Sequence, residues 1–115
     1  MHTIAFVGPS GTGKSYRAIT IAKENGADAF IDDGLLISDT RVLAGISAKR
    51  EATRIASVKR ALFTSREHAE EVKHAIRENN IGTIMILGTS DGMVKKIAEA
   101  LELPSIERVI RIDDV

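Results

Sequence analysis

The chain has 115 residues with 43% apolar and 3% aromatic side chains, so we expect one domain over residues 1–115 with an aliphatic core. Its formal net charge is zero, and few rings are available to stack on bases, so nucleic acid is an unfavoured partner. The absence of Cys excludes disulfides, thiolate catalysis and cysteine metal sites. With no recognisable signal peptide and no apolar run long enough to span a bilayer, we predict a cytoplasmic protein without a membrane partner.

The first elements predicted along the chain are strands and one helix. Residues 3–7 form a short apolar run that is typical of a buried parallel strand, and residues 14–24 have helical spacing. A second strand is predicted over residues 28–32. Two short runs, residues 35–37 and 41–43, flank turn-forming residues and predict a small β-hairpin.

Two helices are predicted in the middle of the chain. Residues 49–63 have helical spacing that places Ile55, Val58 and Leu62 on one face, opposite a basic face. The sequence Thr-Ser-Arg-Glu that follows has the spacing of a capping box, with Thr64 as the cap. We therefore expect the next helix to begin there and to run to about residue 79.

The last elements complete an alternating pattern. Residues 83–87 are the clearest buried strand, and a helix over residues 92–101 and a final strand over residues 108–112 follow. This alternation predicts an α/β fold of three layers, with a mostly parallel sheet of about four strands, helices on both faces and the small β-hairpin beside it. Because the chain stops directly after a strand, it is compatible with a domain excised from a longer protein.

The segment between the first strand and the first helix carries the strongest functional pattern. It reads Gly-Pro-Ser-Gly-Thr-Gly-Lys-Ser over residues 8–15. Glycines let the backbone curl so that its N–H groups converge on a phosphate, and the following helix directs its positive end at the same anion. Lys14 is expected to reach the β- and γ-phosphates, and the Ser15 hydroxyl is expected to bind magnesium. The predicted nucleotide-binding residues are Gly8, Pro9, Ser10, Gly11, Thr12, Gly13, Lys14, Ser15 and Tyr16.

This segment resembles the phosphate loop of the P-loop NTPase superfamily, and it is similar to the loops of nucleotide kinases and some ATPases. The motif itself is short, but the alternating strands and helices are compatible with that superfamily over the whole chain. The resemblance implies that Lys14 is the phosphate lysine and that Ser15 is a magnesium ligand. It also implies an acidic residue at the end of a second core strand, where it holds the magnesium.

Asp32 is the candidate for that acid, because it ends the apolar strand predicted over residues 28–32. Asp33 is a candidate base or water-positioning residue. The alternative is that both aspartates only form a turn with Gly34. After the strand over residues 83–87, hydroxyl side chains could sense a γ-phosphate, although Ser90 is better explained as the N-cap of a helix.

Residues 41–66 carry an excess of positive charge. They contain seven basic residues against the single acid Glu51, which gives this stretch a net charge of +6. Three interpretations stay open: a solvated face paired with acids elsewhere, a cover that neutralises a transferring phosphate as in nucleotide kinases, and a docking surface for a partner or RNA. His68 and His74, six residues apart on one predicted helix, have a spacing that disfavours a shared zinc site.

The functional hypothesis is an Mg-ATP-binding protein that hydrolyses ATP slowly or transfers phosphate to an acceptor that the sequence does not identify. ATP is favoured over GTP because the guanine-reading Asn-Lys-x-Asp motif is absent. Lys14 and Asp33 are the catalytic candidates, and Ser15 and Asp32 are the candidate metal ligands. The alternatives are a nucleotide-sensing interaction module that engages a protein partner with little turnover and, least favoured, a nucleic-acid-associated ATPase.

Overall fold

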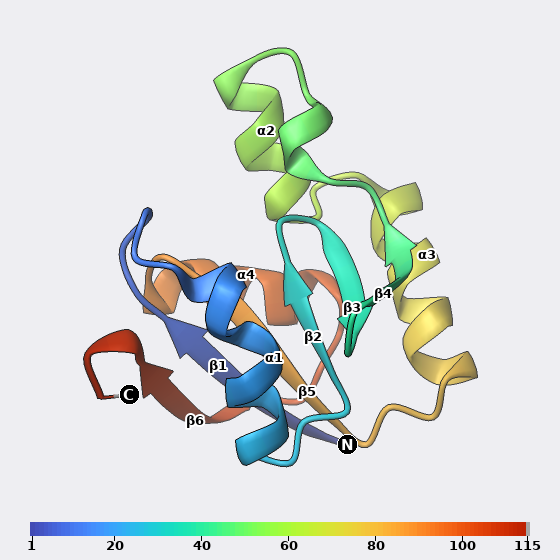
Figure 1. Cartoon of the computed structure of the whole chain (residues 1–115). Helices are drawn as coiled ribbons and strands as arrows, with labels where there is room; N and C mark the ends of the chain where they lie inside the picture. The colour runs from blue at the N-terminus through green and yellow to red at the C-terminus, as the bar shows by residue number, and fades with distance from the viewer. Residues whose placement is uncertain (115) are drawn as a thin grey trace.

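The computed structural model describes residues 1–114, which form a six-stranded sheet with helices packed against it (Figure 1). The strands are β1 (His2–Val7), β2 (Ala29–Asp32), β3 (Leu35–Ser38), β4 (Arg41–Gly45), β5 (Thr83–Gly88) and β6 (Ile106–Arg111). The α-helices are α1 (Lys14–Glu24), α2 (Arg54–Ala61), α3 (Arg66–Glu78) and α4 (Asp91–Ala100). Two short 3₁₀ helices are η1 (Ala48–Arg50) and η2 (Ile112–Asp114).

The predicted fold class was wrong in the number and the direction of the strands. The strand order is β4-β3-β2-β5-β1-β6. β1 pairs in parallel with β5 and β6, and β2 pairs in parallel with β5, whereas β3 is antiparallel to both β2 and β4. The sheet is therefore mixed, with one antiparallel half, and is not the mostly parallel, four-stranded layer of a clear three-layer P-loop arrangement. The predicted hairpin strands form, but they extend the main sheet.

The turn between β2 and β3 explains why the sheet becomes antiparallel. Asp33 and Gly34 have φ values of 55° and 84°, so both residues are left-handed. A two-residue turn of this kind matches the twist of paired strands and returns the chain directly beside the strand that it leaves. Parallel neighbours need a long crossover instead. The Asp-Gly pair between two apolar runs was therefore a hairpin signal that the sequence-based prediction did not use.

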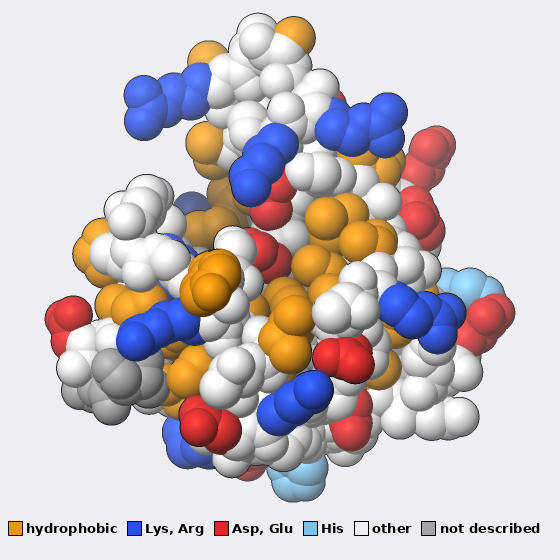
Figure 2. Space-filling model, viewed as in Figure 1, with side chains coloured by type: hydrophobic (Ala, Val, Ile, Leu, Met, Phe, Trp, Pro, Cys, Tyr) orange, Lys and Arg blue, Asp and Glu red, His pale blue; other side chains and the backbone are white. Residues whose placement is uncertain are grey.

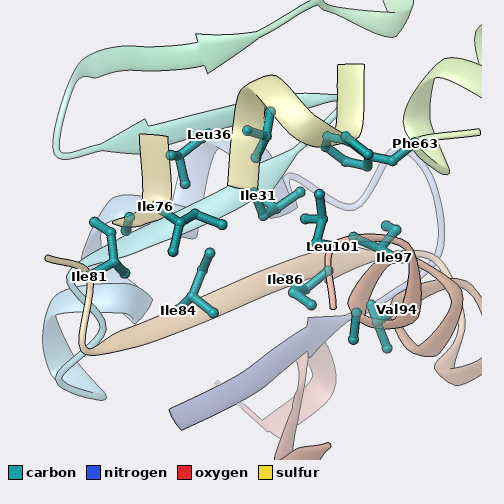
Figure 3. Packing of buried hydrophobic residues seen from close by; sticks show 14 of the residues in the cluster. Ile31, Leu36, Phe63, Ile76, Ile81, Ile84, Ile86, Val94, Ile97 and Leu101 are labelled. Carbon is teal, nitrogen blue, oxygen red and sulfur yellow. The ribbon is translucent and has the colours of Figure 1, made fainter. Parts of the chain in front are cut away.

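Alternating side chains of the central strand β5 supply two hydrophobic clusters on opposite faces of the sheet. Met85 and Leu87 belong to the cluster that packs against α1. Ile84 and Ile86 belong to the larger cluster, which includes buried residues of α3 and α4 (Figure 3). This period of two is the geometry of a strand that is buried on both faces. The two clusters fix α1 on one side of the sheet and α3 and α4 on the other.

The predicted helix over residues 49–63 was wrong in its extent and in its buried face. The chain forms η1, leaves helical geometry, and begins α2 only after Thr53, whose hydroxyl oxygen accepts a hydrogen bond from the Ala56 N–H at 3.1 Å. Ile55 and Val58 are 71% and 52% exposed. The α2 segment projects away from the sheet at the top of Figure 1, so Ile55 and Val58 of the predicted apolar face do not pack into the core, whereas Leu62 packs against the larger cluster.

The capping prediction for the next helix was displaced by one residue. Ser65 is the N-cap of α3, and its hydroxyl accepts a hydrogen bond from the His68 N–H. Thr64 instead donates its hydroxyl hydrogen to the Lys59 carbonyl at 3.1 Å, at the end of α2. Ser90, in contrast, is the N-cap of α4, as predicted. None of the helices within residues 1–114 is both long and apolar enough to cross a bilayer.

Candidate functional site

The loops that follow β1, β2 and β5 meet at one edge of the sheet. These three strands are parallel neighbours, so their carboxyl ends lie together. A cleft of about 510 Å³, the main cleft, lies there and is lined by residues from all three loops. Of the residues predicted from the sequence, it contains Ser10, Gly11, Gly13, Lys14, Ser15, Tyr16, Asp32 and Asp33.

The backbone of the 8–15 loop presents hydrogen-bond donors to this cleft. Gly11 and Gly13 have φ values of 78° and 82°, and a Cβ at either residue would meet open space, so backbone conformation is what favours glycine there. Gly13 caps α1 without a side-chain hydrogen bond. Within residues 1–114, the N–H groups of Gly11, Gly13, Lys14 and Ser15 have no hydrogen-bond acceptor. Unpaired donors at the positive end of a helix form a surface that favours an anion.

Lys14 lies folded back over the same loop. Its ammonium group donates hydrogen bonds to the Gly8 carbonyl at 2.6 Å and to the Pro9 carbonyl at 3.0 Å. Partial burial lowers the pKa of Lys14, and the negative charge of Asp32 opposes this shift. A cation that is partly desolvated and held by neutral carbonyls gains more from a phosphate oxygen than a fully solvated lysine does.

Ser15 and Asp32 are brought together although they lie on different elements. Ser15 is in the first turn of α1 and donates its hydroxyl hydrogen to Asp32 Oδ2 at 2.6 Å, at the end of β2. A hydroxyl and a carboxylate are the hard oxygen ligands that Mg²⁺ prefers, and two protein oxygens fit a site where phosphates and water complete the coordination. Within residues 1–114, no group of three His, Asp or Glu side chains forms a metal site by itself. The pair therefore fits magnesium that arrives with a triphosphate.

Asp33 lines the main cleft and also joins two segments of the backbone. Its Oδ2 accepts a hydrogen bond from the Ser47 hydroxyl at 2.6 Å, and its carbonyl accepts one from the Ala48 N–H at 2.9 Å. These bonds attach η1 to the turn after β2. The turn that was the alternative explanation for Asp33 is therefore present, and its role as a base or a water-positioning residue stays a prediction.

Three of the predicted loop residues, Gly8, Pro9 and Thr12, do not line the main cleft. Gly8 is buried against Ile112, where a Cβ would lie 2.5 Å from the Ile112 Cγ2 atom. Thr12 donates its hydroxyl hydrogen to the Pro9 carbonyl at 2.6 Å, which closes the tip of the loop. These residues shape the loop. Tyr16 does line the cleft, but its side chain is 93% exposed.

Sequence reasoning did not assign several residues that complete the main cleft. They come from the η1–α2 region and from the end of β5 with the start of α4: Lys49, Ala61, Leu87, Gly88, Thr89 and Met93. Lys49 was noted only as part of the basic stretch, because nothing local in the sequence shows that η1 returns to the 8–15 loop. Thr89 is one of the hydroxyl residues after the strand over residues 83–87 that were considered as γ-phosphate sensors; it lines the main cleft, and the sensing role stays a prediction.

Within residues 1–114, the basic stretch over residues 41–66 forms no ion pair with an acid outside the stretch. Of its seven basic residues, Arg60 forms an ion pair within residues 1–114, and its partner Glu51, at 3.5 Å, belongs to the same stretch. The interpretation of a face paired with the acidic remainder is therefore weakened. Of the seven basic residues, Lys49 lines the main cleft, Arg50, Arg54, Lys59 and Arg60 lie on η1 and α2, and Arg41 and Arg66 lie on β4 and α3.

The two histidines of α3 face different environments, as their spacing predicted. His68 is 2% exposed, its ring stacks on Phe63 with centroids 4.3 Å apart, and its Nε2 lies 2.8 Å from the Gly34 carbonyl. Burial lowers the pKa of His68, and the hydrogen bond to Gly34 opposes the shift. His74 is exposed and pairs with Glu78. His68 therefore supports the turn after β2 from behind the cleft.

A scan against protein-family models and searches of the curated proteins and the solved structures gave no significant match for this chain. The functional assignment rests on the residues of the cleft and on their geometry.

Proposed function

We propose that this chain is a P-loop protein that binds Mg-ATP in the main cleft. It either hydrolyses the ATP slowly or transfers the terminal phosphoryl group to an acceptor. The observation that carries the proposal is the 2.6 Å hydrogen bond between Ser15 and Asp32, directly beside the unpaired N–H groups of the 8–15 loop. A hydroxyl, a carboxylate, a lysine and a row of backbone donors are the groups that a magnesium triphosphate requires together.

The roles of the residues follow from their contacts. The N–H groups of residues 11–15 and the first turn of α1 cradle the β- and γ-phosphates. Lys14 exchanges the Gly8 and Pro9 carbonyls for phosphate oxygens, which are stronger acceptors for an ammonium group. Ser15 and Asp32 hold the metal, which, when bound, neutralises the charge that develops on the phosphates. Lys49, which also lines the main cleft, adds a further positive charge.

The test is calorimetric titration of Mg-ATP, Mg-GTP and Mg-ADP into the wild-type chain and into Lys14→Ala. We expect Mg-ATP to bind the wild type and Lys14→Ala to lose about 10- to 100-fold in affinity, because a charge-assisted hydrogen bond to phosphate is removed. Lys95→Ala, an exposed lysine of α4 outside the main cleft, is the matched control and should keep full affinity. Thermal denaturation of each variant separates lost binding from lost folding.

Two results would contradict the proposal. One is that no magnesium triphosphate binds to the folded wild-type chain. The other is that Lys14→Ala binds Mg-ATP as tightly as the wild type does. Equal affinity for Mg-GTP would leave the phosphate site in place and would remove the preference for adenine, which rests on the absent guanine motif.

A second candidate function is a nucleotide-sensing switch, and one observation favours it. Ile55 and Val58 are large apolar side chains that stay exposed on α2, while Ala61 of the same helix lines the main cleft. A partner that covers this helix would then detect whether nucleotide is bound. A phosphate-release assay separates the two functions, since turnover supports the enzyme, and tight binding of Mg-ATP without turnover supports the switch.

A further inference from the structure

A second cleft, of about 540 Å³, adjoins the main cleft at the tip of the 8–15 loop. Its walls come from the loop tip, from α2 and from the start of α4. Ser10, Ala61, Thr89 and Met93 line both clefts, so a molecule in the second cleft lies next to a nucleotide in the main cleft. Figure 2 shows the hollow between the projecting α2 region and the loop, with hydrophobic surface at its back.

The charge of the second cleft differs from that of the main cleft. Arg54 and Lys96 line the second cleft, and no carboxylate does, whereas the main cleft contains Asp32 and Asp33. Within residues 1–114, neither Arg54 nor Lys96 has an ion-pair or hydrogen-bond partner among the side chains. Two uncompensated cations in a concave surface concentrate anions there. The ligand that this cleft favours is therefore negatively charged.

The second cleft also has an apolar wall. Val58 and Leu62 of the α2 region face it together with Met93, and Val58 is 52% exposed although it is a large apolar side chain. A volume of this size suits a small organic molecule, and sites of that kind combine apolar walls with a few polar groups. A small inorganic anion would leave the apolar wall unused.

We propose that the second cleft binds a small organic anion, a molecule with one phosphate or carboxylate group and an apolar body, beside the terminal phosphate of the nucleotide. Its anionic group contacts Arg54 and Lys96, and its apolar body packs on Val58 and Leu62. This inference rests on the proposed function, because it names the class of second ligand that the Mg-ATP site would serve.

The experiment uses inorganic phosphate and phenyl phosphate as probes. Each is titrated calorimetrically into the chain after saturation with magnesium and a non-hydrolysable ATP analogue, so that the main cleft is already filled. We expect phenyl phosphate to bind more tightly than inorganic phosphate, because only phenyl phosphate uses the apolar wall. Arg54→Ala and Lys96→Ala should each weaken phenyl phosphate about tenfold, the loss of one charged contact on a partly exposed surface.

Two further variants sharpen the test. Val58→Ser should remove most of the preference for phenyl phosphate over inorganic phosphate. Lys95→Ala, which removes the neighbouring positive charge on α4 outside this cleft, should leave both affinities unchanged. None of the four variants should change the affinity for the ATP analogue, which also shows that each of them is folded.

The outcomes separate the two proposals. If the analogue binds but phenyl phosphate does not, or if Arg54→Ala and Lys96→Ala bind phenyl phosphate as the wild type does, the second-ligand site is overturned and the proposed function stands. If phenyl phosphate and inorganic phosphate bind equally, the apolar part of the inference is overturned. If the analogue does not bind, the proposed function is overturned, and the second-ligand inference that rests on it is overturned as well.

Discussion

The two halves of the sheet reach the main cleft in different ways. In the parallel half, a strand, a glycine-rich loop and a helix follow one another directly, and the loop places Lys14 and Ser15 within a few residues of each other. In the antiparallel half, β3 and β4 first lead the chain away, and only η1 and α2 bring Lys49 and Ala61 back to the same cleft. The first half contributes the 8–15 loop, which we propose holds the phosphates of a nucleotide. The second half contributes the projecting η1–α2 segment, where Ile55 and Val58 are exposed and Arg60 pairs with Glu51 of the same segment.

The halves are joined at the end of β2. Asp32 lines the main cleft and accepts a hydrogen bond from Ser15. The next residue, Asp33, accepts hydrogen bonds from Ser47 and Ala48 and so attaches the turn to η1. His68 contacts the Gly34 carbonyl of the same turn and supports the turn from the other side. A change in η1 can therefore reach Asp32, the proposed magnesium ligand, through the adjacent Asp33. The predictions below test how far the halves behave as one unit.

The largest effect is expected for Leu36→Ala, in the antiparallel half. Leu36 is fully buried and belongs to the cluster that also contains residues of the parallel half and of α3. Removing its side chain should cost about 2–5 kcal/mol in the free energy of unfolding, as in other buried leucines. Chemical denaturation followed by circular dichroism measures this, with the edge residue Val42→Ala as a control that should cost little. A loss for Leu36→Ala as small as that of Val42→Ala would show that the hairpin folds separately.

A smaller loss is expected for Gly8→Ala, at the start of the loop in the parallel half. The added Cβ would lie 2.5 Å from Ile112 Cγ2 and 2.9 Å from Ile112 Cβ, so the loop or η2 must shift. Overpacking of this kind costs about 1–3 kcal/mol. Gly82→Ala, where the nearest atom is Asp28 Oδ2 at 3.3 Å, is the matched control in the same denaturation experiment. Equal stability of the two variants would mean that Gly8 is not packed as described.

The lowered pKa of the buried His68 leads us to expect that the free energy of unfolding depends on pH. Burial holds its pKa below the ordinary value of 6.5, so near and below that pH the unfolded chain binds a proton that the folded chain does not. Stability should therefore fall as the pH falls below the unfolded pKa, until the folded pKa is passed. His68→Gln, which keeps a donor for the Gly34 carbonyl, should flatten this part of the profile. A wild-type profile that is already flat between pH 7 and pH 5 would argue against a neutral, buried His68.

The smallest effect is expected for Ile55→Ser on α2. Its side chain is 71% exposed, so the substitution should change the free energy of unfolding by no more than about 0.5 kcal/mol. A large destabilisation would show that α2 packs against the body of the protein in solution. An unchanged stability keeps the helix available as a cover or as a partner surface.

The parallel half was predictable from the sequence because its information is local. Short apolar runs predicted β1, β2 and β5, and the 8–15 motif identified Lys14 and Ser15. The antiparallel half was predicted less well. The Asp33-Gly34 hairpin was read only as a turn, and the apolar period of α2 was taken for a core face although Ile55 and Val58 are exposed.

In the candidate site, too, residues specified by a local pattern were predicted better than residues brought in by the tertiary fold. The Ser15–Asp32 pair was expected from the end of a strand, and the structure brings the two side chains into contact. Lys49 and Ala61 reach the main cleft through long-range topology, which no spacing within the sequence shows. The basic stretch was recognised, but the position of its Lys49 in the main cleft became visible only once η1 was placed.

The central claim is that Ser15 and Asp32 hold magnesium for a triphosphate, and the dependence of ATP affinity on magnesium tests it most directly. Calorimetric titrations of ATP with and without magnesium are compared for the wild type and Asp32→Asn, with the surface variant Asp39→Asn as control. Asn tolerates the left-handed φ of 57° at residue 39. We expect magnesium to strengthen ATP binding to the wild type and to Asp39→Asn, and most of that gain to be lost in Asp32→Asn. An equal gain in all three proteins would contradict the account.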